Sequence, residues 1–568
     1  IKIMNWIFKP KDSQEVKKIQ NELNLPTHIV NVLFNRDIKN AQQIKFFLSD
    51  NLSMLHDPFL MKGMDIAVNR IIKNIKSHKP IVIVGDYDLD GISAVSLLKI
   101  GIEKLGGKVI SYIPNRKIEG HGIPKEFLIK SINKGVNLYI TCDFGISELS
   151  SIKKTNSYGL DCIVTDHHIP GETLPPAYSI LNPNQKGCNY PFKDLSGSGV
   201  AFKLVTGIDK KLNNSHKMIE KIIDIAAIGT GADQVPLIGE NRLLVKHGFE
   251  KIRTKSQLGL KFLSKKIKYD NLDKIILSNF NYKIAPFLNA AGRIEDANIV
   301  VDFLTLENFS QLETITKRLI QINKKRQAIQ SNSIQEAIEM VSSDDINKKL
   351  IILEKDSWHP GIIGIIASNI KNKFNKPSII ITFDDDGNGN GSARSINGVN
   401  IYNLLSQFKK YFETFGGHSF AAGFTLKKEK YRVFKDSIIE YLSKKNLIIL
   451  KEDLVLDGKL QLDEINYQFI KSIDCLSPFG PSNPRLRFSL EKLNIIGNPI
   501  VIGRGSILRF KVKKNNKTMD VVLFGKSNEY KTLILGELVD IAGYPEFNLW
   551  KGQKTIQFNA QAIRLSNN

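Results

Sequence analysis

At 568 residues, with 42% hydrophobic and 24% charged residues, the chain is a globular protein too long for one hydrophobic core. Its net charge of +23 favours a nucleic-acid partner. The Lys- and Asn-rich composition typical of proteins from AT-rich genomes explains the same charge equally well. No apolar stretch reaches the ~18 residues of a membrane span, and no signal-peptide pattern is present, so we expect a cytoplasmic protein with no membrane contact. The four cysteines form no Cys-x-x-Cys pair, so we expect neither a zinc site nor a disulfide.

In chain order, residues 1–78 are predicted to form a helical region, because segments such as 66–75 repeat apolar side chains at helical spacing. Residues 79–305 alternate short β-branched runs with helical runs, which is the pattern of a doubly wound parallel sheet. We therefore expect an α/β fold there, with functional groups in the loops at the carboxyl ends of the strands.

Three aspartates, Asp86, Asp88 and Asp90, follow the first apolar run, residues 81–84. Clustered carboxylates repel one another unless a cation holds them together. A calcium-binding EF-hand loop also begins Asp-x-Asp-x-Asp-Gly, but it follows a helix and needs Glu at its last ligand position, where this chain has Leu97. The EF-hand is excluded, and the segment by itself is explained equally well by a metal loop or by a solvated acidic turn.

Further polar loops close the next units of the same sheet. They contribute Asp143, Asp166, His167, His168 and Asp233. Carboxylates with imidazole and without thiolate suit Mn²⁺ or Mg²⁺, and so many ligands can hold two ions about 3.5–4 Å apart, as in phosphoester hydrolysis. A lone His-His pair is more often a surface turn, but its occurrence with several acidic loops favours a metal site.

The remainder of the chain divides into three segments. Residues 306–345 are predicted to form a long linker helix, because their apolar residues lie near one helical face without Gly or Pro. Residues 346–448 are expected to form a second, smaller α/β domain. Residues 452–568 consist of short alternating strands, which predict a small β-barrel.

Short motifs spread along the chain resemble those of a known family. Four are similar to motifs of the DHH phosphoesterases: GDYDLDG at 85–91, TCDFGIS at 141–147, DHH at 166–168 and GTGAD at 229–233. Others resemble the RecJ single-stranded-DNA exonucleases, with their DHHA1 domain and OB fold: EGHG at 119–122, LNAAGR at 288–293, WHPGIIG at 358–364, GSARS at 391–395, FGGH at 415–418 and NLWKG at 548–552. The chain departs from the family's pattern at Phe144, Gly231 and Phe287, and none of these is an expected metal ligand.

The resemblance implies a metal-dependent 5′-to-3′ exonuclease that hydrolyses single-stranded DNA to 5′-mononucleotides in DNA recombination and repair. It also implies a doubly wound parallel-sheet DHH domain, a linker helix, a smaller α/β DHHA1 domain and a C-terminal OB-type β-barrel, with a helicase and a single-strand-binding protein as partners. Two alternatives stay open. One is a short-oligonucleotide or cyclic-dinucleotide phosphodiesterase of the same superfamily, whose chains are typically shorter. The other is a catalytically weak DNA-binding scaffold, which Phe144 keeps open.

The same resemblance implies roles for individual residues. Two Mn²⁺ or Mg²⁺ ions would be held by Asp86, Asp88, Asp90, Asp143, His167 and Asp233. Two histidines would assist: His168 as a ligand or orienting residue, and His121 as a stabiliser of charge on the scissile phosphate. A terminal 5′-phosphate would be held by Arg116, Arg293, Ser392 and Arg394. Further substrate contacts would come from Gly416, Gly417 and His418, unless these form only a tight turn, and from Trp550 of the barrel.

Overall fold

The computed structural model describes the whole chain except residues 1–4, 10–13, 116–122, 213–216, 446–452, 503–506, 526–529, 531–532, 534, 551–552 and 567–568. The chain forms two compact units. The larger comprises Leu52–Val235 and Gly239–Leu450, and the smaller comprises Ile1–Asn51, Pro236–Ile238 and Lys451–Asn568. None of the helices in the described part is both long and apolar enough to cross a membrane.

The larger unit begins with a sheet of five strands: β2 (Pro80–Gly85), β3 (Lys108–Tyr112), β4 (Leu138–Cys142), β5 (Asp161–Thr165) and β6 (Ser179–Leu181). All are parallel, in the order β3-β2-β4-β5-β6. Helices cover both faces: α6 (Lys125–Ile132) and α7 (Leu149–Ser157) pack on one, and α5 (Leu89–Lys104) and α8 (Gly197–Leu212) pack on the other. Burial on both faces explains the continuous β-branched runs in the sequence, and the expected doubly wound sheet is confirmed.

The strand order reverses between β2 and β4, because the chain runs from β2 to β3 on one side and then returns to β4 on the other. At such a switch point the loops after two neighbouring strands leave a crevice at the carboxyl ends of the strands. The loop after β2 carries Asp86, and the loop after β4 carries Asp143. The fold thus puts these two residues where doubly wound sheets hold ligands.

The second part of the larger unit follows α15 (Phe309–Met340), a single helix of 32 residues. Its sheet consists of β7 (Ile351–Glu354), β8 (Ser378–Phe383), β9 (Asn388–Arg394), β10 (Thr414–His418) and β11 (Ala421–Lys427), in the order β10-β11-β9-β8-β7. Neighbouring residues of β8 point to opposite faces, toward α17 (Ile363–Phe374) on one side and α19 (Lys428–Lys444) on the other. The expected linker helix and smaller α/β fold are confirmed.

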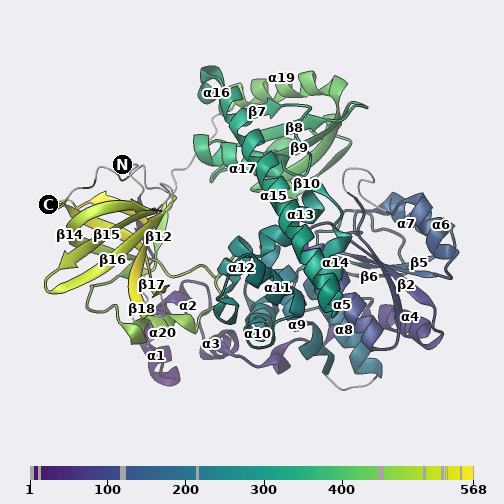
Figure 1. Cartoon of the computed structure of the whole chain (residues 1–568), viewed down its shortest axis with the longest axis horizontal. Coiled ribbons are helices and arrows are strands. Elements are labelled where there is room, and N and C mark those ends of the chain that lie inside the picture. Colours follow the sequence, from purple (N-terminus) through teal and green to yellow (C-terminus); the bar gives the residue numbers. More distant parts are fainter. Residues whose placement is uncertain are drawn as a thin grey trace. The chain divides into compact units, whose positions relative to one another are not determined.

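The smaller unit contains a barrel, drawn in yellow-green to yellow in Figure 1. Its strands are β14 (Phe488–Ile502), β15 (Ile507–Lys514), β16 (Lys517–Phe524), β17 (Leu538–Trp550) and β18 (Gln553–Leu565). They pair in the order β14-β15-β16-β18-β17, and β17 also pairs with β14, which closes the barrel. A closed barrel of five strands is the architecture of an OB fold, as expected.

The N-terminal region is divided between the two units. Its first helices are α1 (Gln14–Leu23), α2 (Thr27–Phe34) and α3 (Ala41–Leu48), and the next is α4 (Met64–Lys76). Val16, Ile29 and Leu33 of the first helices belong to the same buried cluster as Leu476 and Ile541 of the barrel unit. In contrast, α4 packs on α8 and β6 of the larger unit. The helical region expected at 1–78 is therefore not one piece, because its amphipathic helices bury their apolar faces against two different cores.

Candidate metal centre and phosphate pocket

Three carboxylates come from the turn between β2 and α5. Asp86 directly follows β2, and its N–H donates to the Cys142 carbonyl at 3.2 Å, which extends the pairing of β2 with β4. The Asp88 side chain caps α5 by accepting from the N–H groups of Asp90 and Gly91 at 3.0 and 3.1 Å. Carboxylates are favoured at a helix N-terminus by its unpaired N–H groups and its dipole. The strand end and the helix cap together fix the orientation of this acidic turn.

Asp90 is buried against the start of a second helix. Its carboxylate accepts from the N–H groups of Gly197 and Ser198, the first residues of α8, at 2.7 and 2.9 Å. An ideal Cβ on Gly197 would lie only 2.5 Å from Asp143 Oδ1, so a side chain there would displace that carboxylate. The glycine at the start of α8 thus permits Asp90 and Asp143 to pack against one helix end.

Asp143 follows β4 in the left-handed backbone conformation, with φ of 65°. Few residues other than glycine adopt this conformation, and those that do often lie at functional sites. Its N–H donates to the Thr165 carbonyl of β5 at 2.9 Å, which anchors the turn to the sheet. The residue is 3% exposed, and a carboxylate oxygen lies within 4.8 Å of oxygens of Asp86 and Asp88.

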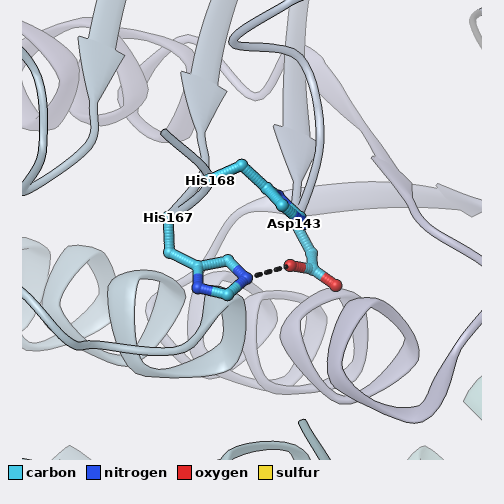
Figure 2. Close-up of side chains that lie close together, drawn as sticks. All are labelled: Asp143, His167 and His168. Atoms are coloured by element: carbon cyan, nitrogen blue, oxygen red, sulfur yellow. Dashed lines mark ion pairs between the residues drawn. The ribbon is translucent and has the colours of Figure 1, made fainter. Parts of the chain in front are cut away.

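The Asp-His-His loop after β5 supplies two imidazoles. His167 Nε2 lies 3.1 Å from Asp143 Oδ1 and 3.6 Å from Asp233 Oδ2, and Figure 2 shows the His167 ring directed at Asp143. His168 Nδ1 lies 2.8 Å from Asp166 Oδ1, which also accepts the backbone N–H groups of both histidines. Asp166 therefore shapes the loop, His167 faces the carboxylates, and His168 lies beside them, half exposed.

Burial and mutual repulsion change the protonation of these groups. Desolvation, and then the charge of Asp88, raise the pKa of Asp90 to about 6. Desolvation, followed by the charges of the neighbouring aspartates, raises the pKa of Asp143 and of Asp233 well above the usual range. Desolvation and the charge of His168 lower the pKa of His167 to about 4, so its ring is neutral at pH 7. A neutral imidazole is the form that binds a metal ion.

Three buried atoms, Asp143 Oδ1, His167 Nε2 and Asp233 Oδ2, have no hydrogen-bond partner among the described residues. The close approach of His167 to Asp143 lacks hydrogen-bond geometry, so these three electron-pair donors converge on one another. A divalent cation would satisfy all three buried atoms at once. Asp233, directly after α9 (Lys217–Ala232), belongs to this group.

Among the described residues the ligand atoms form three triads, in each of which they lie within 4.8 Å of one another. The third is Asp143, His167 and His168; the other two, which together contain the six expected ligands, are Asp90, His167 and Asp233, and Asp86, Asp88 and Asp143. Oxygen ligands with one imidazole nitrogen suit Mn²⁺ or Mg²⁺ rather than zinc in a thiolate site. The six residues fit two such ions.

A second group of expected site residues meets at the N-terminal end of α17. On β9, Arg394 donates to the Ser392 hydroxyl at 3.0 Å. An ideal Cβ on Gly364, the second residue of α17, would lie 2.9 Å from the Arg394 guanidinium and 3.2 Å from Ser392 Oγ. Arg293, in α13 (Ala285–Ile294), donates to the Gly361 carbonyl at 3.2 Å. Three expected phosphate ligands thus surround a helix N-terminus, where anions are favoured. We call Arg293, Ser392 and Arg394 the phosphate pocket, after the role that the sequence resemblance implies for them.

The remaining expected site residues are Arg116, His121, Gly416, Gly417, His418 and Trp550. Arg116 and His121 lie outside the described residues, and Trp550 is described by its backbone alone. The segment 416–418 forms the exposed end of the β10–β11 hairpin. After desolvation and the charge of His168, the charge of His418 also lowers the pKa of His167, so this hairpin end lies near the metal centre.

Sequence reasoning missed the residues that orient the histidine loop. Asn182 and Asn184 donate their side-chain amides to the carbonyls of His168 and His167, at 2.8 and 2.9 Å. They follow the end of β6, the strand next to β5 in the sheet. This position at a strand end could have identified them from the sequence. The two N–H groups of α8 that hold Asp90 offered no signal, because every residue except proline has a backbone N–H.

Three family models match successive parts of the chain. The DHH family N-terminal domain matches residues 80–230, the DHHA1 domain matches 347–444, and the RecJ OB domain matches 456–562. The single-stranded-DNA-specific exonuclease RecJ of Bacillus subtilis is 35% identical over 560 residues, which cover 98% of this chain and 70% of that protein.

Two crystal structures are also similar. RecJ from Thermus thermophilus in complex with Mn²⁺ has a TM-score of 0.83 and 24% identity, and the match covers 99% of this chain and 80% of that one. An exonuclease RecJ bound to manganese has a TM-score of 0.58 and 28% identity, over 70% of this chain and 97% of that one. The first match covers every domain described above.

Proposed function

The chain belongs to the RecJ family of single-stranded-DNA-specific exonucleases, and from this membership we propose that it hydrolyses single-stranded DNA from the 5′ end to 5′-mononucleotides. The observation that carries the proposal is the pair of ligand triads at the carboxyl ends of β2, β4 and β5. Relatives were crystallised with manganese, and the oxygen-rich ligand set supports Mn²⁺ or Mg²⁺ here.

The chain's own residues prepare the site for a phosphodiester. When bound, the two ions supply Lewis-acid charge that activates water and neutralises the phosphate. His167 offers a neutral nitrogen held at the carboxylates. Burial would lower the pKa of His168, but the hydrogen bond to Asp166 raises it to about 9, so this ring carries a proton at neutral pH. A cation beside the ligand cluster favours an incoming phosphate.

The phosphate pocket supports cutting from the 5′ end. A terminal phosphate carries a second negative charge that an internal phosphodiester lacks, so paired arginines distinguish the strand end from the rest of the strand. Arg394, held by the Ser392 hydroxyl, has its guanidinium at the start of α17. We propose that Arg293, Ser392 and Arg394 bind the terminal 5′-phosphate.

The structure gives the two rival functions little support. The Phe144 side chain packs on the apolar cluster beneath α6 and α7, so its presence leaves all six ligands in their triads. A catalytically weak scaffold would not need these six metal ligands. The barrel that follows the two α/β parts favours long single strands over short oligonucleotides or cyclic dinucleotides.

The cellular setting is a further proposal that rests on the family resemblance. We propose that the reaction takes place in the cytoplasm, on strands that a helicase releases and a single-strand-binding protein covers. Affinity purification of the tagged protein from cells with damaged DNA tests this, and the absence of both partners would contradict it.

End-labelled oligonucleotides test the proposed function directly. With Mn²⁺ or Mg²⁺, a 5′ label on a single strand should appear at once as mononucleotide, whereas a 3′ label should pass through a ladder of shortened strands. A blunt duplex should resist. Early release of the 3′ label, or equal cutting of duplex, would refute the polarity or the strand preference. Hydrolysis confined to dinucleotides would support the phosphodiesterase alternative.

A further inference from the structure

Helix α15 carries a half-buried arginine, Arg326, on the face by which it packs. Leu319, Ile322 and Ala337 of this helix are buried. Arg326 lies four residues after Ile322 and three before Ile329, and residues at these spacings share one helical face. An arginine thus stands in the middle of the stripe by which α15 packs.

The packing of this stripe places Arg326 beside the phosphate pocket. Helix α15 packs on both α13 and α17. Ile329 belongs to the same apolar cluster as Ile294 and Ile362. Ile294 directly follows Arg293 in the chain, and Ile362 directly follows the glycine whose carbonyl accepts from Arg293. Arg326, one turn before Ile329, therefore lies at the rim of this cluster with Arg293.

The guanidinium of Arg326 is held by neutral groups. It donates to the side-chain oxygens of Asn323 and Gln330, which lie on the same helix. Within the described part of the chain it forms no ion pair with a carboxylate, and its Nε is buried without a hydrogen-bond partner. Burial, and then the positive charge of Arg293, lower the pKa of Arg326. Two like charges are thus close together and partly desolvated.

The carboxylate of Glu295, two residues after Arg293, does not relieve the repulsion between Arg293 and Arg326. Glu295 is paired instead with Arg318 at 2.6 Å and with Lys325 at 3.3 Å, on the outer side of α15. Burying like charges together is costly unless an opposite charge joins them. A phosphate dianion offers that charge and several acceptor oxygens for guanidinium donors.

We propose that Arg326 is a further binding residue of the phosphate pocket, where it holds the terminal 5′-phosphate of the strand together with Arg293. This inference rests on the proposed function and extends its substrate pocket to a third guanidinium. Asn323 and Gln330 hold the Arg326 guanidinium in one orientation before the phosphate arrives, which lowers the entropy cost of binding.

Equilibrium binding of matched oligonucleotides tests the proposal. Full-length protein is titrated with a fluorescent single strand bearing either a 5′-phosphate or a 5′-hydroxyl, with Ca²⁺ in place of Mn²⁺. Arg326→Gln should weaken binding of the phosphorylated strand about ten- to a hundredfold, as expected for a charge-assisted hydrogen bond, and should leave the hydroxyl strand unaffected. The affinity of Arg326→Lys for the phosphorylated strand should lie between that of the wild type and that of Arg326→Gln. Arg318→Gln, which removes a surface charge from the same helix, should behave as wild type.

Three results would overturn the proposal: equal losses on both strands, no loss in Arg326→Gln, or a wild type without preference for the 5′-phosphate. Thermal unfolding of each variant shows whether the helix is disturbed. Hydrolysis of the 5′-hydroxyl strand with Mn²⁺ tests the proposed function separately, because it does not require the terminal phosphate.

Discussion

Replacing Asp90 with Asn should make the stability of the metal-free protein less dependent on pH. The pKa of Asp90 is raised from 3.8 to about 6, and at about 1.4 kcal/mol per pKa unit its ionisation costs the folded state about 3 kcal/mol. Because the folded-state pKa lies above the unfolded one, the folded state binds the proton more tightly. The contribution of Asp90 to stability is therefore largest below pH 4 and is lost as the pH rises through about 6.

The asparagine also loses a hydrogen bond, and this loss does not depend on pH. The Asp90 carboxylate accepts two N–H groups, from Gly197 and Ser198, whereas an amide oriented for one of them presents its NH₂ to the other. This mismatch costs about 1–3 kcal/mol. At pH 4 the Asp90→Asn variant should have a lower free energy of unfolding than the wild type. Between pH 4 and pH 8 the difference between the two proteins should change by about 3 kcal/mol in favour of the variant.

Urea unfolding in EDTA between pH 4 and pH 8 measures this shift, with the fluorescence of Trp358, buried in the larger unit, as one probe. Asp385→Asn, on an exposed turn of the same unit, is the matched control and should show no such trend. A shift of less than about 1 kcal/mol would refute the raised pKa of Asp90. Saturating Mn²⁺ should restore the advantage of the wild type, since a ligand at a hundredfold its Kd stabilises by about 2.7 kcal/mol.

Asp143→Ala should abolish hydrolysis but keep DNA binding, because this carboxylate lies within ligand distance of both the acidic turn and His167; a residual rate above a tenth, under about 1.4 kcal/mol of barrier, would contradict that role. EDTA should silence the wild-type nuclease, with Mn²⁺ or Mg²⁺ but not Ca²⁺ restoring it, and rescue by Zn²⁺ alone would contradict the oxygen-rich ligand set. Arg394→Ala should reduce turnover of 5′-phosphorylated strands about ten- to a hundredfold more than that of 5′-hydroxyl strands, and equal losses in matched kinetics would make it a general contact. A fragment of residues 52–450 should bind single strands with a log–log salt slope shallower by about 0.7 for each phosphate that the barrel would otherwise bind, and an unchanged slope would mean that the barrel with Trp550 does not bind DNA.

Much of the candidate metal centre could be predicted from the sequence because several of its residues lie at strand ends; Asp233, which follows α9, does not. Asp86, Asp143 and His167 each follow a β-branched run, and parallel strands bring their carboxyl ends to one edge of the sheet. Neither the distances nor the left-handed turn at Asp143 had to be known. The same argument, carried one strand further, would have included Asn182 and Asn184.

Other features depend on packing that the local sequence does not encode. Arg326 stands in a run that reads Lys324, Lys325, Arg326, and nothing in that run distinguishes the half-buried residue from the two exposed ones. The amphipathic pattern of residues 14–48 predicts helices correctly, but it does not say which core receives their apolar faces. That choice is made by contacts with residues more than four hundred positions away, such as Leu33 with the barrel cluster.

The division of the barrel unit between distant parts of the chain has a consequence during synthesis. Helices α1 to α3 leave the ribosome early, yet the strands that share their core follow residue 451. At about 5–20 residues per second, the intervening stretch of about 400 residues takes on the order of 20–80 s to translate. Throughout that interval the nascent helices present apolar faces to chaperones and proteases. A product that stops before the barrel would lack the residues that bury those faces in the complete chain.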